Sequence, residues 1–139
     1  MIKVDDGLCL GCPSCSNICP SQKIILSDSG ETRNIHWKMC NEVCDLCVLF
    51  CPVRALVLVP YDENVPEPDL SFELVACKIC QSRYATEPML RRIESSLPAD
   101  MQKDSEGLEW IRICPECRRN IEAQRATRQM VQGRRKQSP

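Results

Sequence analysis

The stretch CLGCPSCSNICP, at residues 9–20, decides how the rest of this chain is interpreted. It places four cysteines in the spacing C-x2-C-x2-C-x3-C and closes the run with a proline. A second block, CNEVCDLCVLFCP at residues 40–52, repeats the pattern with one extra residue after its first cysteine. Because internal repeats indicate copies of one structural unit, the first half of the chain is expected to contain the same unit twice.

Short apolar segments rich in β-branched residues flank both blocks. Residues 2–4 and 24–26 lie on either side of the first block, and residues 32–37 and 56–59 on either side of the second. These segments have the composition of strands, and residues 28–30 have the composition of a turn between the halves. The expected unit is therefore a strand, a cysteine loop, a half-turn of helix and a second strand.

The cysteine spacing also predicts a chemistry. Three closely spaced thiolates can bind three irons of one [4Fe–4S] cubane, while the fourth, beyond a short helical turn, ligates the other cluster. The expected ligands are Cys9, Cys12, Cys15 and Cys51 for the first cluster, and Cys40, Cys44, Cys47 and Cys19 for the second. The extra residue after Cys40 leaves the role of that cysteine open, and zinc knuckles or disulfides are the alternative use of the eight thiols.

A second region of different composition follows. Residues 61–75 begin with a run rich in proline and acidic side chains, which predicts an extended linker after a first domain at residues 1–60. Residues 76–118 hold two C-x2-C pairs, a spacing that favours a tetrahedral site for structural Zn²⁺ or a single iron. The expected ligands are Cys77, Cys80, Cys114 and Cys117. A redox disulfide pair or unbound thiols are the alternatives.

Between and after these pairs the sequence predicts mostly helix. Thr86 is expected to cap a helix whose apolar face reaches Leu97, and residues 109–113 resemble a strand. Residues 119–139 are expected to form a basic helix and tail, with Gly133 ending the helix.

Composition limits the classes of protein to be considered. Twelve cysteines and only six aromatic residues among 139 predict a thin apolar core that needs metal to stabilise it. The N-terminus does not resemble a signal peptide, and the apolar run at residues 48–59 is short and interrupted by Pro52 and Arg54. A cytoplasmic location, where thiols stay reduced, is therefore expected. Glycine-rich phosphate loops and dinucleotide fingerprints are absent from the sequence.

Charge is distributed unevenly along the chain. The formal net charge is −1 for residues 1–60, −6 for residues 61–110 and +6 for residues 111–139. Such asymmetry suggests docking surfaces. A zinc module with a basic tail could also bind nucleic acid, but the tail lacks the aromatic side chains that stack on bases.

The first sixty residues resemble the bacterial two-cluster ferredoxins, and the resemblance covers both cysteine blocks in order. It implies an α+β fold in which a pseudo-twofold 2[4Fe–4S] ferredoxin-like domain precedes a small module with four cysteines, similar to a zinc ribbon, and a C-terminal helix.

The whole chain is similar to the ferredoxin-like subunit of formate hydrogenlyase and related group 4 membrane-bound [NiFe] hydrogenases, itself similar to the two-cluster subunit of complex I. The stretches that carry this resemblance are CKICQSRYAT at residues 77–86 and ICPECRR at residues 113–119. It implies an electron-transfer relay subunit without a catalytic site of its own, which passes electrons between a low-potential donor and the hydrogenase module. Its partners would be the other subunits, which would hold it at the cytoplasmic face of the membrane, and nucleic acid is not expected among them. A free ferredoxin-type carrier and, further off, a zinc-ribbon nucleic-acid-binding protein are the alternatives.

Overall fold

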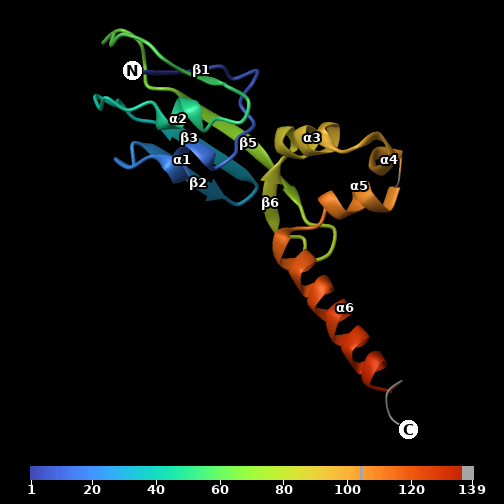
Figure 1. The fold of residues 1–139 in the computed structure, drawn as a ribbon. Coiled ribbons are helices and arrows are strands. Elements are labelled where there is room, and N and C mark those ends of the chain that lie inside the picture. Colours follow the sequence, from blue (N-terminus) through green and yellow to red (C-terminus); the bar gives the residue numbers. More distant parts are fainter. Residues whose placement is uncertain (104, 136–139) are drawn as a thin grey trace.

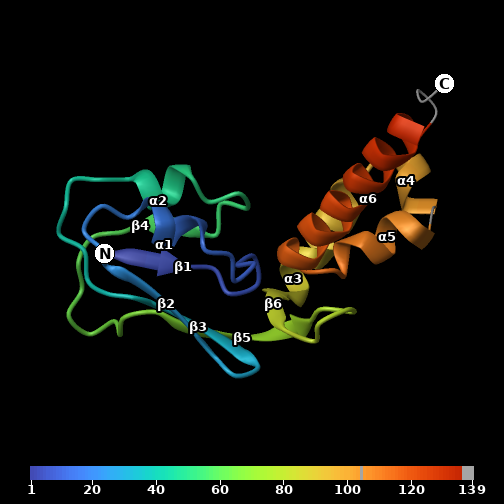
Figure 2. The same cartoon turned by 90° about the horizontal axis from the view of Figure 1, so that it is seen from below.

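The computed structural model describes residues 1–103 and 105–135. It is a mixed structure, in agreement with the expected α+β class, in which one sheet joins two parts and the last helix projects away from both (Figures 1 and 2). In chain order the elements are β1 (Ile2–Val4), α1 (Ser14–Ile18), β2 (Ile24–Ser29), β3 (Thr32–Trp37), α2 (Leu46–Leu49), β4 (Leu56–Leu58), β5 (Asp69–Ala76), β6 (Arg83–Thr86), α3 (Glu87–Ser96), α4 (Ala99–Lys103), α5 (Ser105–Ile111) and α6 (Pro115–Arg135).

The first half of the chain contains two copies of the expected unit. β1 leads through the first cysteine loop into α1 and β2, and β3 leads through the second loop into α2 and β4. The copies exchange strands, because β1 pairs antiparallel with β4 and β2 pairs antiparallel with β3. The buried side chains of this half include Ile2, Ile24, Ile35, Trp37 and Leu56, which form one core. The four strands expected from the sequence are thus present, and their pairing explains the internal repeat.

The turn between the copies lies later than expected. Asp28 and Ser29, expected in the turn, belong to β2, and Gly30 turns the chain with φ of +60°. Asp28 stays in the strand because it pairs opposite Arg33. Its two carboxylate oxygens accept hydrogen bonds from Arg33 Nε at 2.7 Å and Nη2 at 2.8 Å.

The expectation of a linker over residues 61–75 has to be corrected. Residues 61–68 contain no helix or strand, but β5 begins at Asp69 and pairs antiparallel with β3. Leu70, Phe72 and Leu74 alternate with more exposed residues, which is the pattern of a strand with one buried face. β6 pairs with β5, so a four-stranded sheet in the order β2-β3-β5-β6 connects the first half of the chain to the second half.

The second half has its own small core of Ala85, Leu90 and Ile111. The expected helix is confirmed as α3, and the side-chain oxygen of Thr86 accepts the capping hydrogen bond from the Met89 N–H at 3.3 Å. The prediction of a strand at residues 109–113 is wrong, because the helix α5 continues to Ile111. Leu108 and Ile111, three residues apart, both contact this core, which is a helical spacing.

The C-terminal helix α6 begins earlier and ends later than expected. Pro115 occupies its first position, where a missing N–H costs little. Gly133 does not end the helix, which continues through Arg135, since glycine inside a helix costs only about 1 kcal/mol and arginines follow it. The remainder of the expected tail, residues 136–139, lies outside the described residues. Over the described ranges, none of the helices combines the length and the apolarity needed to span a bilayer.

Candidate metal centres

The thiols expected to hold the first cluster surround one cavity. Its lining includes apolar side chains such as Leu56 beside four cysteines. These cysteines are Cys9, Cys12, Cys15 and Cys51. Three of them come from the first loop and from α1, whereas the fourth follows α2, so the structure brings together the crossed set that the spacing predicts.

The second crossed set lines another cavity. That cavity is bordered by Ile2 and Ile24 from the core. Its cysteines are Cys19, Cys40, Cys44 and Cys47. The extra residue of this motif is accommodated outward, since Val43 is fully exposed while Cys40 keeps its place at the cavity.

The two cysteines that cross between the copies have equivalent surroundings. The Lys23 N–H donates to Cys19 Sγ at 3.3 Å, and the Ala55 N–H donates to Cys51 Sγ at 3.2 Å. In each copy the preceding residue has a positive φ, 50° in one and 55° in the other. An N–H directed at sulfur favours the thiolate, which is the form that binds metal. The pseudo-twofold relation therefore extends to single hydrogen bonds.

The surroundings of the buried Cys15 thiol indicate whether the first cavity suits a metal cluster. Burial, together with the neighbouring Cys12, raises the pKa of Cys15 to about 12, while the nearby Trp37 indole acts in the opposite direction. The Trp37 indole N–H is buried and has no acceptor at ordinary hydrogen-bond geometry. A cluster-bound sulfur would both ionise the thiol and supply the acceptor, so this part of the first cavity fits an iron–sulfur group.

The distances between sulfur atoms distinguish a third cysteine group from the first two. Four sulfurs around one zinc ion, each about 2.3 Å from it, lie about 3.8 Å from one another. Among the described residues, the four-cysteine group whose sulfurs all lie within 4.8 Å of one another is Cys77, Cys80, Cys114 and Cys117. The eight thiols of the first two groups are spread more widely, which suits a group larger than a single ion.

The third group has the geometry of a mononuclear tetrahedral site. Cys77 follows β5 and Cys80 precedes β6, while Cys114 precedes α6 and Cys117 lies in its first turn. The sulfurs of Cys80 and Cys114 are 3.7 Å apart, close to the spacing around one ion. Cys114 is therefore brought to the strands by the helical insert, and the second pair opens a helix instead of following a strand as the sequence suggested.

The charges at this group suit a bound cation. Burial raises the pKa of Cys77, but backbone N–H groups, foremost those of Cys114 and Cys80, lower it to about 6. The interaction with Cys80 raises the pKa of Cys117 in turn. Neighbouring thiols compete in this way because like charges so close together repel. A divalent ion would let all four ionise, so the donor set fits Zn²⁺ or a single iron.

Side chains around the third group hold its two cysteine pairs together. Tyr84 donates its hydroxyl hydrogen to the Ile111 carbonyl at 2.6 Å. Arg112, just before Cys114, binds Glu87 at 2.7 Å and Glu94 at 3.1 Å. The strand after the first pair and the helix α3 are thereby tied to the segment that delivers the second pair.

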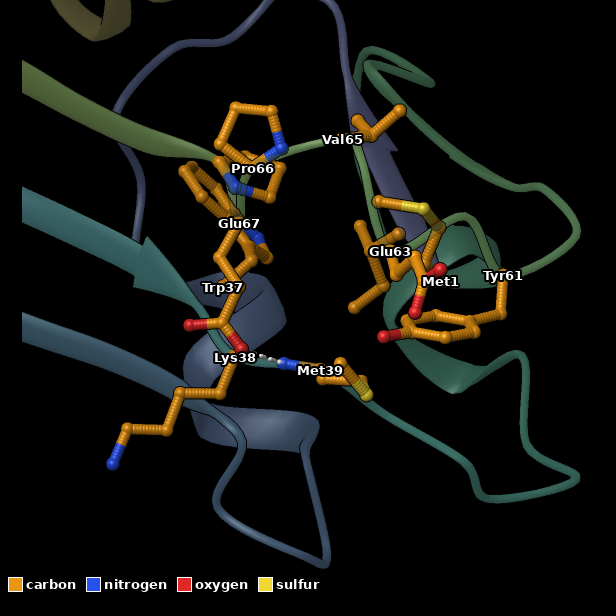
Figure 3. Close-up of a pocket in the computed structure, with 11 residues that line it drawn as sticks. Met1, Trp37, Lys38, Met39, Tyr61, Glu63, Val65, Pro66 and Glu67 are labelled. Atoms are coloured by element: carbon orange, nitrogen blue, oxygen red, sulfur yellow. Dashed lines mark hydrogen bonds between the residues drawn. The ribbon is translucent and has the colours of Figure 1, made fainter.

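A shallow cavity of about 280 Å³ beside Trp37 shows how the second loop is anchored (Figure 3). One carboxylate oxygen of Glu67 accepts a hydrogen bond from the Met39 N–H at 2.6 Å, and the other lies 3.0 Å from His36 Nε2. Glu67 therefore fixes the chain just before Cys40, at the point where the second cysteine loop begins.

The sequence did not indicate two buried residues at the first loop. Arg33 Nη1 donates to the Gly11 carbonyl at 3.3 Å, and the Thr86 hydroxyl donates to the Leu10 carbonyl. Thr86 was expected only as a helix cap. The available signal was the position of Arg33 in β3, where alternation with Ile35 places it on the buried face.

Comparison with known proteins agrees with the first two groups. Residues 1–52 match the family model described as a 4Fe-4S dicluster domain. A search of curated proteins gave no match to the chain. The matched segment contains all eight cysteines of the two cavities. The match and this arrangement together support a ferredoxin-like iron–sulfur protein.

Proposed function

We propose that this chain is an electron-transfer relay subunit that binds two [4Fe–4S] clusters and belongs to a larger oxidoreductase complex. The observation that carries the proposal is the sorting of eight thiols into two crossed groups of four within one small core. When bound, each cluster supplies reversible one-electron transfer. The protein contributes ligands, burial and hydrogen bonds, and bond-making chemistry by its own side chains is not part of the proposal.

The residues around the cavities would set the reduction potentials. Cys15 of α1 and Cys47 of α2 are buried in the same core, so the two cavities lie on either side of shared apolar packing. Burial disfavours the more negatively charged reduced state, whereas N–H donors and nearby positive charge favour it. The ligands proposed are those of the two cavities: Cys9, Cys12, Cys15 and Cys51, and Cys19, Cys40, Cys44 and Cys47.

We further propose that Cys77, Cys80, Cys114 and Cys117 bind one Zn²⁺, or a single iron, in a structural role. Four cysteine ligands leave no open coordination position for chemistry. The site joins the end of β5 to the start of α6, so a bound ion would hold the projecting helix in a defined direction.

Metal analysis tests these assignments. Anaerobic purification should give about eight irons, eight sulfides and one zinc per chain, as the ligand count implies. Cys114→Ser is expected to lose the zinc and keep the EPR signals of both reduced clusters, because its cysteine group is separate from the two cavities. A folded, colourless chain without inorganic sulfide would refute the proposed function, and a Cys114→Ser variant with a full zinc content would refute the third site.

The proposed partners are the hydrogenase or complex I-like subunits of a membrane-bound assembly, which would hold the chain at the cytoplasmic face. Support comes from α6, which projects from the body and has exposed basic side chains such as Arg119 and Arg128 (Figure 1). A freely diffusing carrier has no need of such a helix. A stable stoichiometric complex on co-purification is expected, and a monomer reduced by several unrelated donors would favour the free carrier.

Charge reversal on α6 tests the docking role. The double variant Arg119→Glu with Arg128→Glu is expected to weaken association with the complex at least about tenfold, with a smaller effect at high salt. The control, Lys3→Glu with Arg92→Glu, makes the same change in net charge at exposed positions away from α6. If both double variants weakened association with the immobilised complex equally, that result would argue against a specific role for the helix.

A further inference from the structure

Two polar or charged residues are buried within the part of the chain that the structure describes: Arg33 and Thr86, with 7% and 0% of their surface exposed. Both donate hydrogen bonds to the first cysteine loop, and they bind consecutive carbonyl groups, those of Gly11 and Leu10. Burying polar groups is costly unless they are hydrogen-bonded, so this convergence is a built feature of the fold. It lies outside the ligand sets of the three metal centres.

The two donors come from opposite ends of the chain but share one sheet face. In the β3–β5 pairing Arg33 lies opposite Phe72, and in the β5–β6 pairing Leu74 lies opposite Thr86. Since directly opposed residues share a face, and Phe72 and Leu74 are two positions apart, Arg33, Phe72 and Thr86 all point to the same side. The first cysteine loop packs on this side.

Peptide geometry carries the effect of these bonds to the cysteines. In a trans peptide the C=O and the following N–H point in opposite directions. Holding the Leu10 carbonyl toward Thr86 therefore turns the Gly11 N–H away from the sheet. Burial raises the pKa of the Cys9 thiol, and the Gly11 N–H acts in the opposite direction. By the same geometry, Arg33 on the Gly11 carbonyl turns the Cys12 N–H away from the sheet.

Close packing leaves the loop little freedom. A Cβ atom on Gly11 would lie 2.7 Å from a ring carbon of Phe72 and 2.9 Å from the Thr86 methyl carbon. The corresponding loop of the second motif is different, since Asn41, Glu42 and Val43 are exposed. The contact with the second half of the chain is thus made by the loop of the first cluster.

We propose that Thr86 is a positioning residue for the first cluster: its hydroxyl holds the Leu10–Gly11 peptide so that the Gly11 N–H faces the Cys9 sulfur. The inference rests on the proposed function, because it concerns the cluster that Cys9 would bind. Hydrogen bonds to ligand sulfur favour the reduced cluster and raise its potential. Thr86 also caps α3, 76 positions along the chain from Leu10, so the potential of the first cluster is linked to the module that holds the third metal centre.

The test compares Thr86→Val, which keeps the shape and removes the hydroxyl, with Thr86→Ser, which restores the donor. Redox titration followed by EPR on the full chain should show the first cluster harder to reduce in Thr86→Val. We expect about a tenfold lower ratio of reduced to oxidised first cluster at a fixed ambient potential, or 59 mV for one electron. Thr86→Ser should match the unaltered protein, and the second cluster should not respond. Cys9→Ser and Cys40→Ser assign the two signals.

A separate control accounts for the lost helix cap. Arg92→Gly weakens the same helix at an exposed position by a similar amount, without touching Thr86. It should lower the thermal midpoint and leave both potentials unchanged. A shift in Arg92→Gly, equal shifts of both clusters in Thr86→Val, or no shift at all would overturn the inference.

Metal content decides the outcome if Thr86→Val cannot retain its clusters. Loss of about four irons with the second signal retained supports the positioning role, and loss of all eight contradicts it. The proposed function is judged on the unaltered chain: absence of clusters there refutes that function, whereas normal clusters with an unresponsive Thr86 refute only the present inference.

Discussion

Replacing Cys19 with serine is expected to damage the cluster of the second motif and to spare the cluster of the motif in which Cys19 lies. The reason is geometric, because Cys19 lines the cavity of Cys40, Cys44 and Cys47. Cys51→Ser should have the converse effect, since Cys51 lines the cavity of the first motif. Each variant should lose between one and four irons, and one EPR signal of the reduced protein should change or disappear while the other persists.

Matched variants within each motif make this test specific. Cys12→Ser should affect the same signal as Cys51→Ser, and Cys44→Ser the same signal as Cys19→Ser. If Cys19→Ser instead shared its affected signal with Cys12→Ser, each motif would hold its own cluster and the crossed assignment would be wrong. Loss of both clusters in every variant would show that the two halves assemble only together, and partial reconstitution with iron and sulfide would then be needed to rank the signals.

Gly11→Ala is expected to be the most damaging substitution outside the cysteines. Gly11 has φ of +65°, and a Cβ atom added there would lie 2.7 to 2.9 Å from side-chain atoms of Phe72 and Thr86. A side chain at positive φ costs about 1–2 kcal/mol, and overpacking adds about 1–3 kcal/mol. We expect a total loss of about 2–5 kcal/mol, seen as a lower thermal midpoint and as loss of iron from the first cluster.

Gly30→Ala provides the matched control. Gly30 also has a positive φ, +60°, but a Cβ there would meet no atom within 4 Å. It should therefore cost only the backbone contribution of about 1–2 kcal/mol and leave both clusters in place. Similar losses in the two variants, measured by thermal unfolding and iron analysis, would mean that Phe72 and Thr86 yield to the new methyl group and do not hold the loop.

The link between the two halves of the chain follows from one strand. β5 begins after the proline-rich segment, pairs with β3 of the ferredoxin-like half and ends at Cys77. The third cysteine group is therefore attached directly to the sheet on which the first cysteine loop packs, instead of being separated from it by a flexible segment (Figure 2). This continuity is the reason that Thr86, beside the third centre in sequence, reaches the first loop.

Local features were predictable where short-range chemistry determines them. The cysteine spacing indicated the grouping of the thiols, because loop lengths and the proline after each fourth cysteine restrict which sulfurs can meet. Thr86 was recognised as a cap from its position before Glu87 and Pro88. Segments whose secondary structure depends on distant partners were harder to predict: a strand was expected at residues 109–113, where α5 ends, and a linker where β5 begins at Asp69.

The sequence by itself determined the repeat and the short strands that flank it and predicted the ligand chemistry, since these depend on residue type and on spacings of a few positions. Only the tertiary structure decided that Val43 is turned outward, that β5 joins the sheet, and that Arg33 and Thr86 hold the first loop. These outcomes depend on contacts between residues 22 to 76 positions apart, and such contacts form only when the strands pair in one particular register.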